Sequence, residues 1–559
     1  TPMAQRQIDN LRKRLYMARS MQIFGVSSLL LCVVCTLFIY VGWQLVAVYT
    51  FGVALLLLVI SLAISIRELL ISVKALEYRL DNVKIKKDVK KMSKTFKNLS
   101  NVKKIHMIGI GGVSMSGIAV VLKKAGFEVT GSDRSYGDMT DMLEKNGIHV
   151  FIGSNADLVR DADIVVYTSA ISQHDSEYVK AKALGIPTME RAKFLGMLLK
   201  NYEIPICIAG THGKTTTTSM TSLIFIDAGY DPNVQVGGKH KKLDNLNYRI
   251  GNSEYFILEA CEYVDSFLNF PHHTATILNI DEDHLDYFSG IEEIKESFKK
   301  FILNIKKNGY LIMNKDDINS MDVLEHVKDE LKEKNVTVYT FSLSDPTANI
   351  YAKNMSCNIK GFYSFDVTDN ATGKTYSYYL TVPGIHNVYD ALAAITTAHA
   401  HGIEFEKMKK TLNEFCGAKR RFELKDNLGN NILVYDDYSH HPTEVKATLA
   451  AAKQKHPNKI IAIFQPHTFS RTKELLDDFA SAFYDADVVI IPDIYPAREI
   501  DDGSISSCDL IDKLKANKVN AIYIKDFNEI VKYVKSIMEP NDIVLTLGAG
   551  DVTKISEIR

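Results

Sequence analysis

Residues 208–218, with the sequence IAGTHGKTTTT, decide how the centre of this chain folds. The apolar residues 204–209 predict a strand, a glycine-containing turn follows, and the residues from Lys214 onward predict the start of a helix. A strand, loop and helix in this order place backbone N–H groups and a lysine ammonium around a polyphosphate, and the Thr215 hydroxyl can reach Mg²⁺. The stretch therefore predicts an ATP site.

The turn is a shortened form of the usual phosphate loop, because Ile208 stands where the first glycine of that loop belongs. An ordinary surface turn is the alternative, and the four threonines after the lysine argue against it. The residues predicted to bind ATP here are Gly210, Thr211, His212, Gly213, Lys214, Thr215 and Thr216.

Composition limits the classes of protein. The 559 residues leave room for about three or four domains, and a hydrophobic content of 46% excludes a disordered chain. A formal net charge of −1 gives no reason to expect nucleic-acid binding. The seven cysteines are scattered without zinc-site spacing, which is typical of free thiols in a reducing compartment.

The N-terminal part predicts a membrane anchor. Residues 22–66 contain no charged side chain, and this run is long enough for two crossings of about 20 residues each. The segment GWQ at residues 42–44 divides it into helices predicted at residues 23–41 and 46–64. Basic residues on both flanks place both ends in the cytoplasm. The prediction is a hairpin anchor at residues 1–66; a signal peptide fits poorly, and a buried globular hairpin is the alternative.

Residues 67–102 predict a basic helical stalk or linker. Apolar residues have heptad spacing at residues 69–83, over barely two heptads, so self-association of two chains through the stalk is one interpretation. An amphipathic helix on anionic lipid and a solvated linker are the others.

Three α/β domains are predicted after the stalk. The first, residues 103–203, begins with a strand, the glycine turn GIGGVSMSGIA, a helix reaching about Lys124, and a second strand that ends at Asp133. In this arrangement glycines let a diphosphate approach the helix N-terminus and the acid meets a ribose hydroxyl. The pattern alone does not separate NAD from a UDP-sugar.

The second domain, residues 204–418, contains the phosphate loop. A strand at residues 255–258 ends at Glu259, a usual position for a Mg²⁺ ligand or an acid that positions water. Another strand ends in an acidic segment with His284, which reads either as further metal ligands or as a solvated loop. A helix of small residues near Asn387 suits a turn that holds a base.

The third domain, residues 419–559, again alternates strands and helices. Polar clusters follow its strands, where open α/β sheets bind ligands. At its start, Arg420 and Arg421 can clamp a transferring phosphoryl group, or form an ordinary surface pair. The fold class is α/β with three domains: a Rossmann-like first domain, a central phosphate-loop domain and a Rossmann-like C-terminal domain, preceded by the hairpin and the stalk.

Nine segments in this order make residues 103–559 resemble the Mur ligases, and the first of them is similar to the alanine-adding branch of that family. The segments are GIGGVSMSGIA, AGTHGKTTTT, EACEY, NIDEDHLDYF, PGIHNVYDALAA, GAKRRFE, DDYSHHPTE, QPHTFSRT and LGAGD.

The resemblance implies an ATP-dependent ligation. The lactyl carboxylate of UDP-N-acetylmuramate attacks the γ-phosphate of ATP, and the amine of L-alanine then attacks the acyl phosphate to form an amide. Activation is needed because a carboxylate is a poor electrophile, and the phosphoryl step needs positioning and charge neutralisation, with Mg²⁺ as the metal.

The resemblance also implies roles for individual residues. The catalytic set is Lys214, Glu259, His284 and Arg421, and the metal ligands are Thr215, Glu259 and His284. Asn387, Arg421 and Asp437 contact the nucleotide, and His440, His467 and Arg471 lie at the acceptor end. The UDP site consists of Gly109, Gly111, Gly112, Ser116, Asp133 and Ser169. Asp390 departs from the asparagine of many relatives.

Three alternatives stay open. A ligase that recycles ready-made peptides has the same ATP and UDP sites with a larger acceptor pocket. A folate- or amino-acid-polymerising ligase lacks a separate UDP-binding domain. An inactive membrane scaffold does not need an intact phosphate loop. The anchor predicts catalytic domains on the inner face of a bacterial cell membrane, where tethering raises the local concentration of product near a membrane enzyme.

Overall fold

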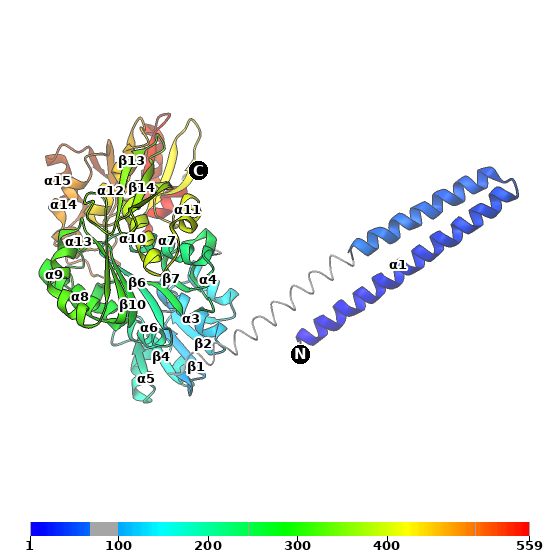
Figure 1. Cartoon of the computed structure of the whole chain (residues 1–559), viewed down its shortest axis with the longest axis horizontal. Helices are drawn as coiled ribbons and strands as arrows, with labels where there is room; N and C mark the ends of the chain where they lie inside the picture. The colour runs from blue at the N-terminus through cyan, green and yellow to red at the C-terminus, as the bar shows by residue number, and fades with distance from the viewer. Residues whose placement is uncertain (1, 68–98, 244, 498, 558–559) are drawn as a thin grey trace. The chain divides into compact units, whose positions relative to one another are not determined.

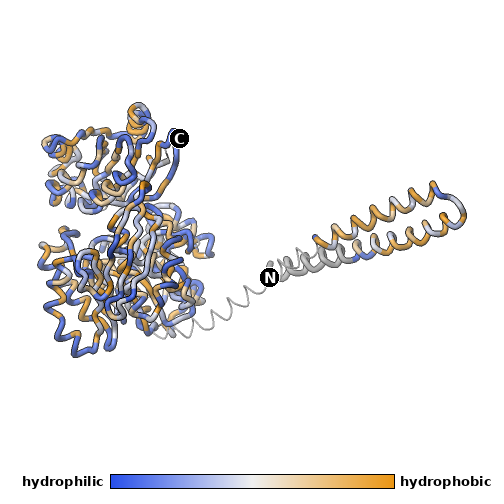
Figure 2. Tube along the Cα trace, turned by 45° about the horizontal axis from the view of Figure 1, so that its top comes forward, coloured by the Kyte–Doolittle hydropathy of each residue, from blue (hydrophilic) through white to orange (hydrophobic). Residues whose placement is uncertain are grey.

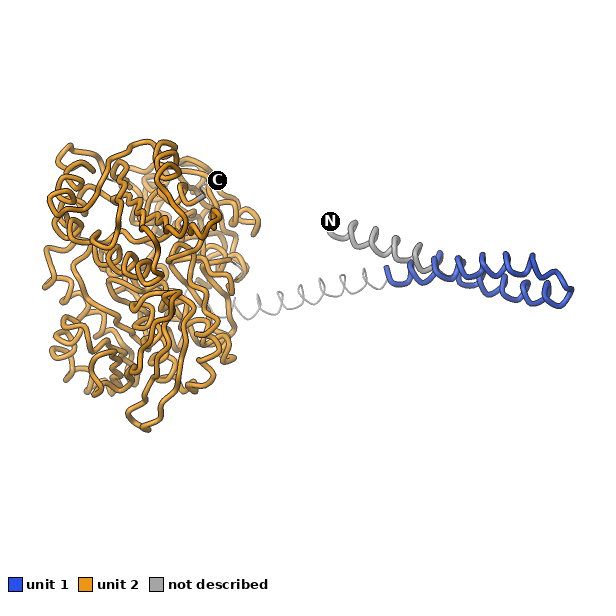
Figure 3. The backbone as a smooth tube through the Cα atoms, turned by 90° about the horizontal axis from the view of Figure 1, so that it is seen from above, with its two compact units in different colours: residues 1–92 blue, residues 93–559 orange. Residues whose placement is uncertain are grey.

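The structure, a computed structural model, describes residues 2–67, 99–243, 245–497 and 499–557. The chain forms two compact units, Thr1–Met92 and Ser93–Arg559 (Figures 1 and 3). The heptad spacing at residues 69–83 lies outside the described residues.

The first unit contains two long helices. Helix α1 runs from Pro2 to Tyr40, and the second helix covers Gln44–Arg67. Their apolar parts, Arg19–Tyr40 and Gln44–Arg67, have mean hydropathies of 2.4 and 2.6 and are long enough to cross a membrane. The Ser28 hydroxyl donates to the carbonyl of Ala54 at 2.7 Å, so a polar side chain of one helix is satisfied by the other. The predicted pair of helices is confirmed, and Figure 2 shows that most of their residues are hydrophobic.

The second unit begins with a five-stranded parallel sheet in the order β3-β2-β1-β4-β5. The order reverses between β2 and β4 on either side of β1, so the glycine turn after β1 lies at the crevice where such sheets bind ligands. The strands are β1 (Lys104–Ile108), β2 (Glu128–Asp133), β3 (His149–Ile152), β4 (Ile164–Tyr167) and β5 (Thr188–Glu190). The helices are α3 (Val113–Lys124), α4 (Asp138–Lys145), α5 (Ser176–Ala183) and α6 (Arg191–Leu199).

A ten-stranded mixed sheet forms the middle of this unit, in the order β15-β14-β13-β12-β11-β10-β6-β9-β7-β8. Strand β6 pairs in parallel with β10 and β9, so the phosphate loop leaves the centre of the sheet. The strands are β6 (Ile204–Ala209), β7 (Asn233–His240), β8 (Leu246–Arg249), β9 (Tyr255–Glu259), β10 (His272–Ile277), β11 (Ile305–Asn314), β12 (Thr337–Ser342), β13 (Ile350–Cys357), β14 (Phe362–Asp369) and β15 (Lys374–Pro383). The helices are α7 (Lys214–Asp227), α8 (Ile291–Leu303), α9 (Ile318–Glu333), α10 (His386–Ala400) and α11 (Phe405–Asn413).

The last sheet has six strands in the order β16-β17-β21-β18-β19-β20, and only β16 is antiparallel to its neighbour. Strands β17, β21 and β18 lie side by side, which brings the ends of three predicted strands to one edge. The strands are β16 (Glu423–Asn427), β17 (Leu433–Asp437), β18 (Ile460–Phe464), β19 (Val488–Ile491), β20 (Ala521–Tyr523) and β21 (Ile543–Leu547). The helices are α12 (Pro442–Lys453), α13 (Phe469–Glu474), α14 (Leu476–Ala482), α15 (Ser507–Ala516) and α16 (Phe527–Ile537).

Helices α7 and α10 pack against each other in the core of the middle sheet. The buried faces consist largely of small side chains, such as Thr217 and Ala394, and small side chains let two helices approach closely. The phosphate loop at the start of α7 is therefore held against the first turn of α10. Residues of the loop and of α10 line the same cavity.

Candidate active site

The phosphate loop has the backbone that its glycines predict. Gly210 and Gly213 have φ values of 142° and 84°, which favour glycine. A Cβ atom on Gly213 would lie 2.3 Å from an Asp390 carboxylate oxygen, so space also requires glycine there. Helix α7 begins at Lys214, and its free N–H groups face the loop, which is the arrangement that binds a phosphate.

Lys214 is held at the loop by a buried acid. Its Nζ donates to the carbonyls of Gly210 (2.5 Å) and Thr211 (3.0 Å) and lies 3.1 Å from Glu262. Burial lowers the pKa of Lys214, but the Glu262 carboxylate outweighs it, so the pKa is raised and the ammonium stays charged. Sequence reasoning missed Glu262, although it stands in the segment EACEY.

Thr215 and Glu259 lie together, as predicted. The Thr215 hydroxyl donates to the two carboxylate oxygens of Glu259 at 3.1 and 3.0 Å. The backbone N–H of Gly237 donates to the same carboxylate at 2.7 Å. A Cβ on Gly237 would lie 2.4 Å from a Glu259 carboxylate oxygen and 2.9 Å from the Thr215 hydroxyl, so a larger residue would force these side chains to shift. Gly237 was not predicted, because strand β7 carries no motif.

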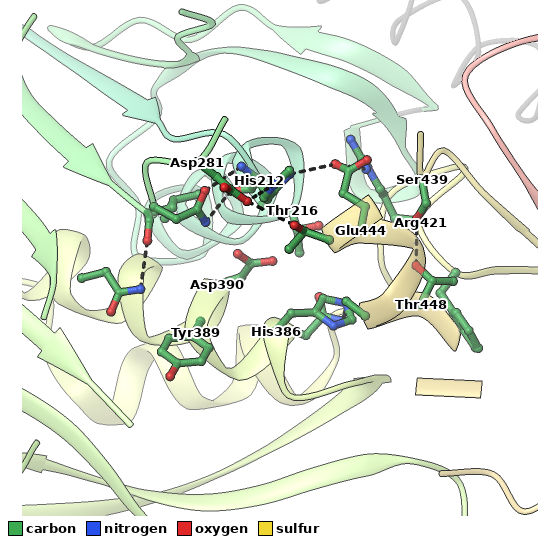
Figure 4. A pocket seen from close by; sticks show the side chains of 18 of the residues that line it. His212, Thr216, Asp281, His386, Tyr389, Asp390, Arg421, Ser439, Glu444 and Thr448 are labelled. Atoms are coloured by element: carbon green, nitrogen blue, oxygen red, sulfur yellow. Dashed lines mark hydrogen bonds and ion pairs between the residues drawn. The ribbon is translucent and has the colours of Figure 1, made fainter. Parts of the chain in front are cut away.

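A cavity of about 480 Å³ lies between the phosphate loop, helix α10 and the C-terminal sheet (Figure 4). It brings together three predicted nucleotide contacts from distant parts of the chain: Asn387, Arg421 and Asp437. Other lining residues come from the phosphate loop, the loop after β10, the start of α9, and helices α10 and α12. They include His212, Asn279, Asp281, Asp317, His386, Asp390, Thr443 and Glu444.

Polar groups near Asn387 are oriented by hydrogen bonds. The Asn387 side-chain amide donates to the carbonyl of Pro383 at 2.6 Å and lies 3.1 Å from Nε2 of His386. Burial lowers the pKa of His386 to about 4, so the ring is neutral and Nε2 can accept from Asn387. Neutral, planar polar groups of this kind suit a nucleotide base.

The C-terminal side of the cavity is charged. The Asp437 carboxylate accepts from the backbone N–H groups of Phe422 (2.6 Å) and Ser439 (2.8 Å), and burial raises its pKa. Nη1 of Arg421 lies 3.9 Å from Glu444, and the guanidinium lies 5.4 Å from the Tyr438 ring centroid. A cation on this wall can neutralise a phosphate.

Asp390 lies against the phosphate loop. Its carboxylate accepts from the Thr217 hydroxyl at 3.0 Å and is almost fully buried. Burial raises the pKa of Asp390 to about 7, so the group is half-protonated near neutral pH. A neutral carboxyl group here resembles the amide of asparagine in its charge.

A second cavity, of about 200 Å³, contains the predicted acceptor-end residues His440, His467 and Arg471. Arg471 forms a buried ion pair with Asp283 at 2.6 Å, across the domain junction. Burial opposes ionisation of Asp283, but His284 and Arg471 hold the pKa of that carboxyl well below its usual range. The cavity therefore holds one guanidinium, already paired with Asp283, together with His284, His440 and His467.

His284 lies in this second cavity, 4.6 Å from the Tyr263 ring between centroids, and has a positive φ of 56°. Burial lowers the pKa of His284 to about 3, which leaves a neutral imidazole. Among the described residues, the group of His and carboxylate ligand atoms within 4.8 Å of one another is His212, Asp281 and His441, which differs from the predicted metal set.

In the first sheet, the N–H of Gly111 donates to Asp133 at 2.7 Å, so the predicted glycine turn and acid meet. Gly112 precedes helix α3, and Gly109 has a positive φ of 75°. Ser116 is buried with its hydroxyl on the carbonyl of Val113, and Ser169 is exposed.

Three α/β sheets in one unit, a phosphate loop and a cavity between two of the sheets define a multidomain nucleotide-binding α/β protein. The chain belongs to the Mur ligase family. The profile described as Mur ligase family, catalytic domain, matches residues 104–203, the Mur ligase middle domain matches residues 208–398, and the Mur ligase glutamate ligase domain matches residues 420–550. A fourth profile, described as protein of unknown function (DUF2721), matches residues 1–78.

Relatives and solved structures agree with this membership. A UDP-N-acetylmuramate–L-alanine ligase from Acetivibrio thermocellus is 47% identical over 82% of this chain and 95% of its own length. One from Clostridium tetani is 45% identical over 82% of this chain and 98% of its own. The crystal structure of a UDP-N-acetylmuramate–alanine ligase from Thermotoga maritima is 28% identical, with a TM-score of 0.69 over 81% of this chain and 97% of that chain. The three-domain α/β fold predicted from the sequence is thereby confirmed.

Proposed function

We propose that this protein joins L-alanine to the lactyl carboxylate of UDP-N-acetylmuramate with ATP, in the synthesis of peptidoglycan precursors. The observation that carries the proposal is the pair of cavities, one at the phosphate loop and one that contains Arg471, His440 and His467 at the acceptor end. Relatives with this name, 45–47% identical over 82% of the chain, support the substrate assignment.

The residues of the chain divide the reaction between the two cavities. The N–H groups at the start of α7 and the Lys214 ammonium hold the β- and γ-phosphates, and Arg421 closes the nucleotide cavity from the third domain. The carboxylate of the sugar attacks the γ-phosphorus, and ADP leaves. The amine of L-alanine then attacks the acyl carbon, a C–N bond forms, and inorganic phosphate leaves. Arg471, with His440 and His467, positions the amino acid.

Mg²⁺ fits the pair of Thr215 and Glu259. Two carboxylate oxygens and a hydroxyl oxygen 3.0–3.1 Å apart form the oxygen-rich donor set that this ion prefers. A bound Mg²⁺ supplies charge neutralisation of the phosphates. His284 is the proposed second-metal ligand, since its imidazole is neutral.

The first sheet is the proposed UDP site. The turn and its acid consist of Gly109, Gly111, Gly112 and Asp133. Ser116 in helix α3 and Ser169 after strand β4 complete the proposed set. The proposed domains are residues 103–203, 204–418 and 419–559, after the anchor at residues 1–66 and the stalk at residues 67–102. Self-association through the stalk is part of the same proposal.

The hairpin is proposed to hold the catalytic domains at the inner face of the cell membrane. Only 11% and 17% of the residues in the two apolar windows are buried within the hairpin, so most of its apolar surface needs another covering. Lipid is the covering that two helices of this length and hydropathy fit.

The test is phosphate release by the full-length protein in lipid, with ATP, Mg²⁺, UDP-N-acetylmuramate and one acceptor at a time. Release that needs both the sugar and L-alanine is expected. Release with a tripeptide but not with L-alanine would instead assign the chain to peptide recycling. Lys214→Ala is the inactive control, because it removes the ammonium from the phosphate loop.

A further inference from the structure

Glu444 lies between the two cavities and has no role in the scheme above. It belongs to the first turn of helix α12 and lines the larger cavity, while His440, four residues earlier, lines the smaller one. Its side chain is 14% exposed, so the carboxylate is mostly enclosed by protein. An enclosed carboxylate requires partners, and the partners lie on both sides.

One carboxylate oxygen faces the nucleotide. Oε1 of Glu444 lies 3.5 Å from Nδ1 of His212 in the phosphate loop and 3.9 Å from Nη1 of Arg421 (Figure 4). Both distances are those of ion pairs rather than of hydrogen bonds. Burial lowers the pKa of His212, but Asp281 and Glu444 outweigh it and raise the pKa to about 9, so the loop carries an imidazolium at neutral pH.

The other oxygen faces the acceptor. Oε2 of Glu444 accepts from the backbone N–H of His440 at 3.1 Å and lies 3.3 Å from Nδ1 of its ring. Nδ1 also lies 3.0 Å from the carbonyl of Tyr438. These contacts fix the orientation of the ring and leave Nε2 as the nitrogen that can face the smaller cavity. Burial opposes ionisation of Glu444, but His440 and His212 hold its pKa well below the usual range.

We propose that Glu444 is a positioning residue that couples nucleotide binding to acceptor binding, because one rigid carboxylate holds the phosphate-loop His212 and the acceptor-side His440 at the same time. His212 lies in the loop after β6 of the middle sheet, and Glu444 lies on helix α12 beside the C-terminal sheet. Their contact therefore forms only when these two parts are docked. Nucleotide on the loop then favours the docked state, and the docked state presents His440 to the amino acid. The inference rests on the proposed function, since it takes ATP and L-alanine as the two ligands.

The test is the coupling factor between the two ligands. Calorimetry gives the Kd of the β,γ-imido analogue of ATP for the full-length protein with Mg²⁺ and UDP-N-acetylmuramate, without and with saturating L-alanine. In the wild type we expect saturating L-alanine to lower the Kd of the analogue at least about fivefold, within the usual range of such couplings. Glu444→Gln keeps the shape of the side chain but removes its charge. In this variant we expect the two Kd values, without and with L-alanine, to agree within about twofold.

Two further variants make the result decisive. Glu529→Gln changes an exposed acid in the first turn of α16, a helix of the same C-terminal part of the chain. This variant should keep the wild-type coupling factor. Glu444→Asp keeps the charge but shortens the reach to His212 and His440; it should also lose the coupling, and it decides the matter if Glu444→Gln does not fold.

The inference is overturned if a folded Glu444 variant retains the wild-type factor. It is also overturned if the wild type shows a factor of one while it releases phosphate with L-alanine. A wild type that releases no phosphate with L-alanine would instead overturn the proposed function, and the coupling to L-alanine with it.

Discussion

Asp390 places an acid beside a loop that binds anions, and its proton determines the charge there. The pKa is about 7 in the folded protein, against 3.8 ordinarily. Between these values the native state binds a proton that the unfolded state does not, so the unfolding free energy falls as the pH rises from about 4 to about 7. The full effect is at most about 4 kcal/mol, from about three pKa units.

Asp390→Asn should therefore flatten the dependence of the melting temperature on pH between about pH 4 and about pH 7, and raise stability at about pH 8. It should also lower the KM for ATP several-fold at about pH 8 and change it little at about pH 5, because only the ionised carboxylate repels phosphate. The exposed Asp512→Asn serves as control. Parallel pH profiles for the Asp390 variant and the wild type would show that Asp390 does not titrate in this window.

At Gly237 the prediction depends on the space available for a side chain rather than on charge. The Cβ of Gly237→Ala would lie 2.4 Å from Glu259 and 2.9 Å from Thr215, so the proposed metal-binding side chains must shift. We expect kcat to fall about 100-fold, as for other losses of metal positioning, and the Mg²⁺ concentration needed for half activity to rise. Gly137→Ala is the matched control, because nothing lies within 4 Å of its Cβ. Unchanged Mg²⁺ dependence would contradict the proposed metal site.

At the scale of elements, the ion pair between α13 and the loop after β10 holds two parts of the chain together. Arg471→Met leaves Asp283 buried without its cation, a change that typically costs about 3 kcal/mol. We expect a lower melting temperature and a KM for L-alanine raised at least about tenfold. The double variant with Asp283→Asn should recover most of the stability but not the KM. Recovery of both would show that Arg471 acts only in docking.

Elements with motifs were predictable, and elements without them were not. The residues predicted at the ends of β6 and β9 lie together because these strands are parallel neighbours in one sheet. Asp437, at the end of β17 in the other sheet, lines the same cavity as the phosphate loop. Strands β13–β15 were not predicted, since they carry no polar cluster at their ends. Gly237, Glu262 and Glu444 were missed for a related reason: the role of each depends on at least one contact with a residue 22 or more positions away in the chain.

At the scale of the whole molecule, the hairpin predicts where the protein works rather than what it does. Two apolar helices with mean hydropathies of 2.4 and 2.6 expose most of their side chains, and exposed apolar surface of this extent is unstable in water. We expect the full-length protein to float with phospholipid vesicles in a density gradient and residues 93–559 to stay in the aqueous fractions.

The same pair of proteins separates anchoring from catalysis. Residues 93–559 form a compact unit that contains both cavities, so its kcat for phosphate release should lie within about twofold of that of the full-length protein in lipid. In cells, deletion of the hairpin should then lower precursor flux through reduced local concentration rather than through a slower enzyme. Unchanged growth and flux in the deletion strain would contradict the tethering role, whereas a large loss of kcat in the purified unit would show that the hairpin supports the catalytic fold itself.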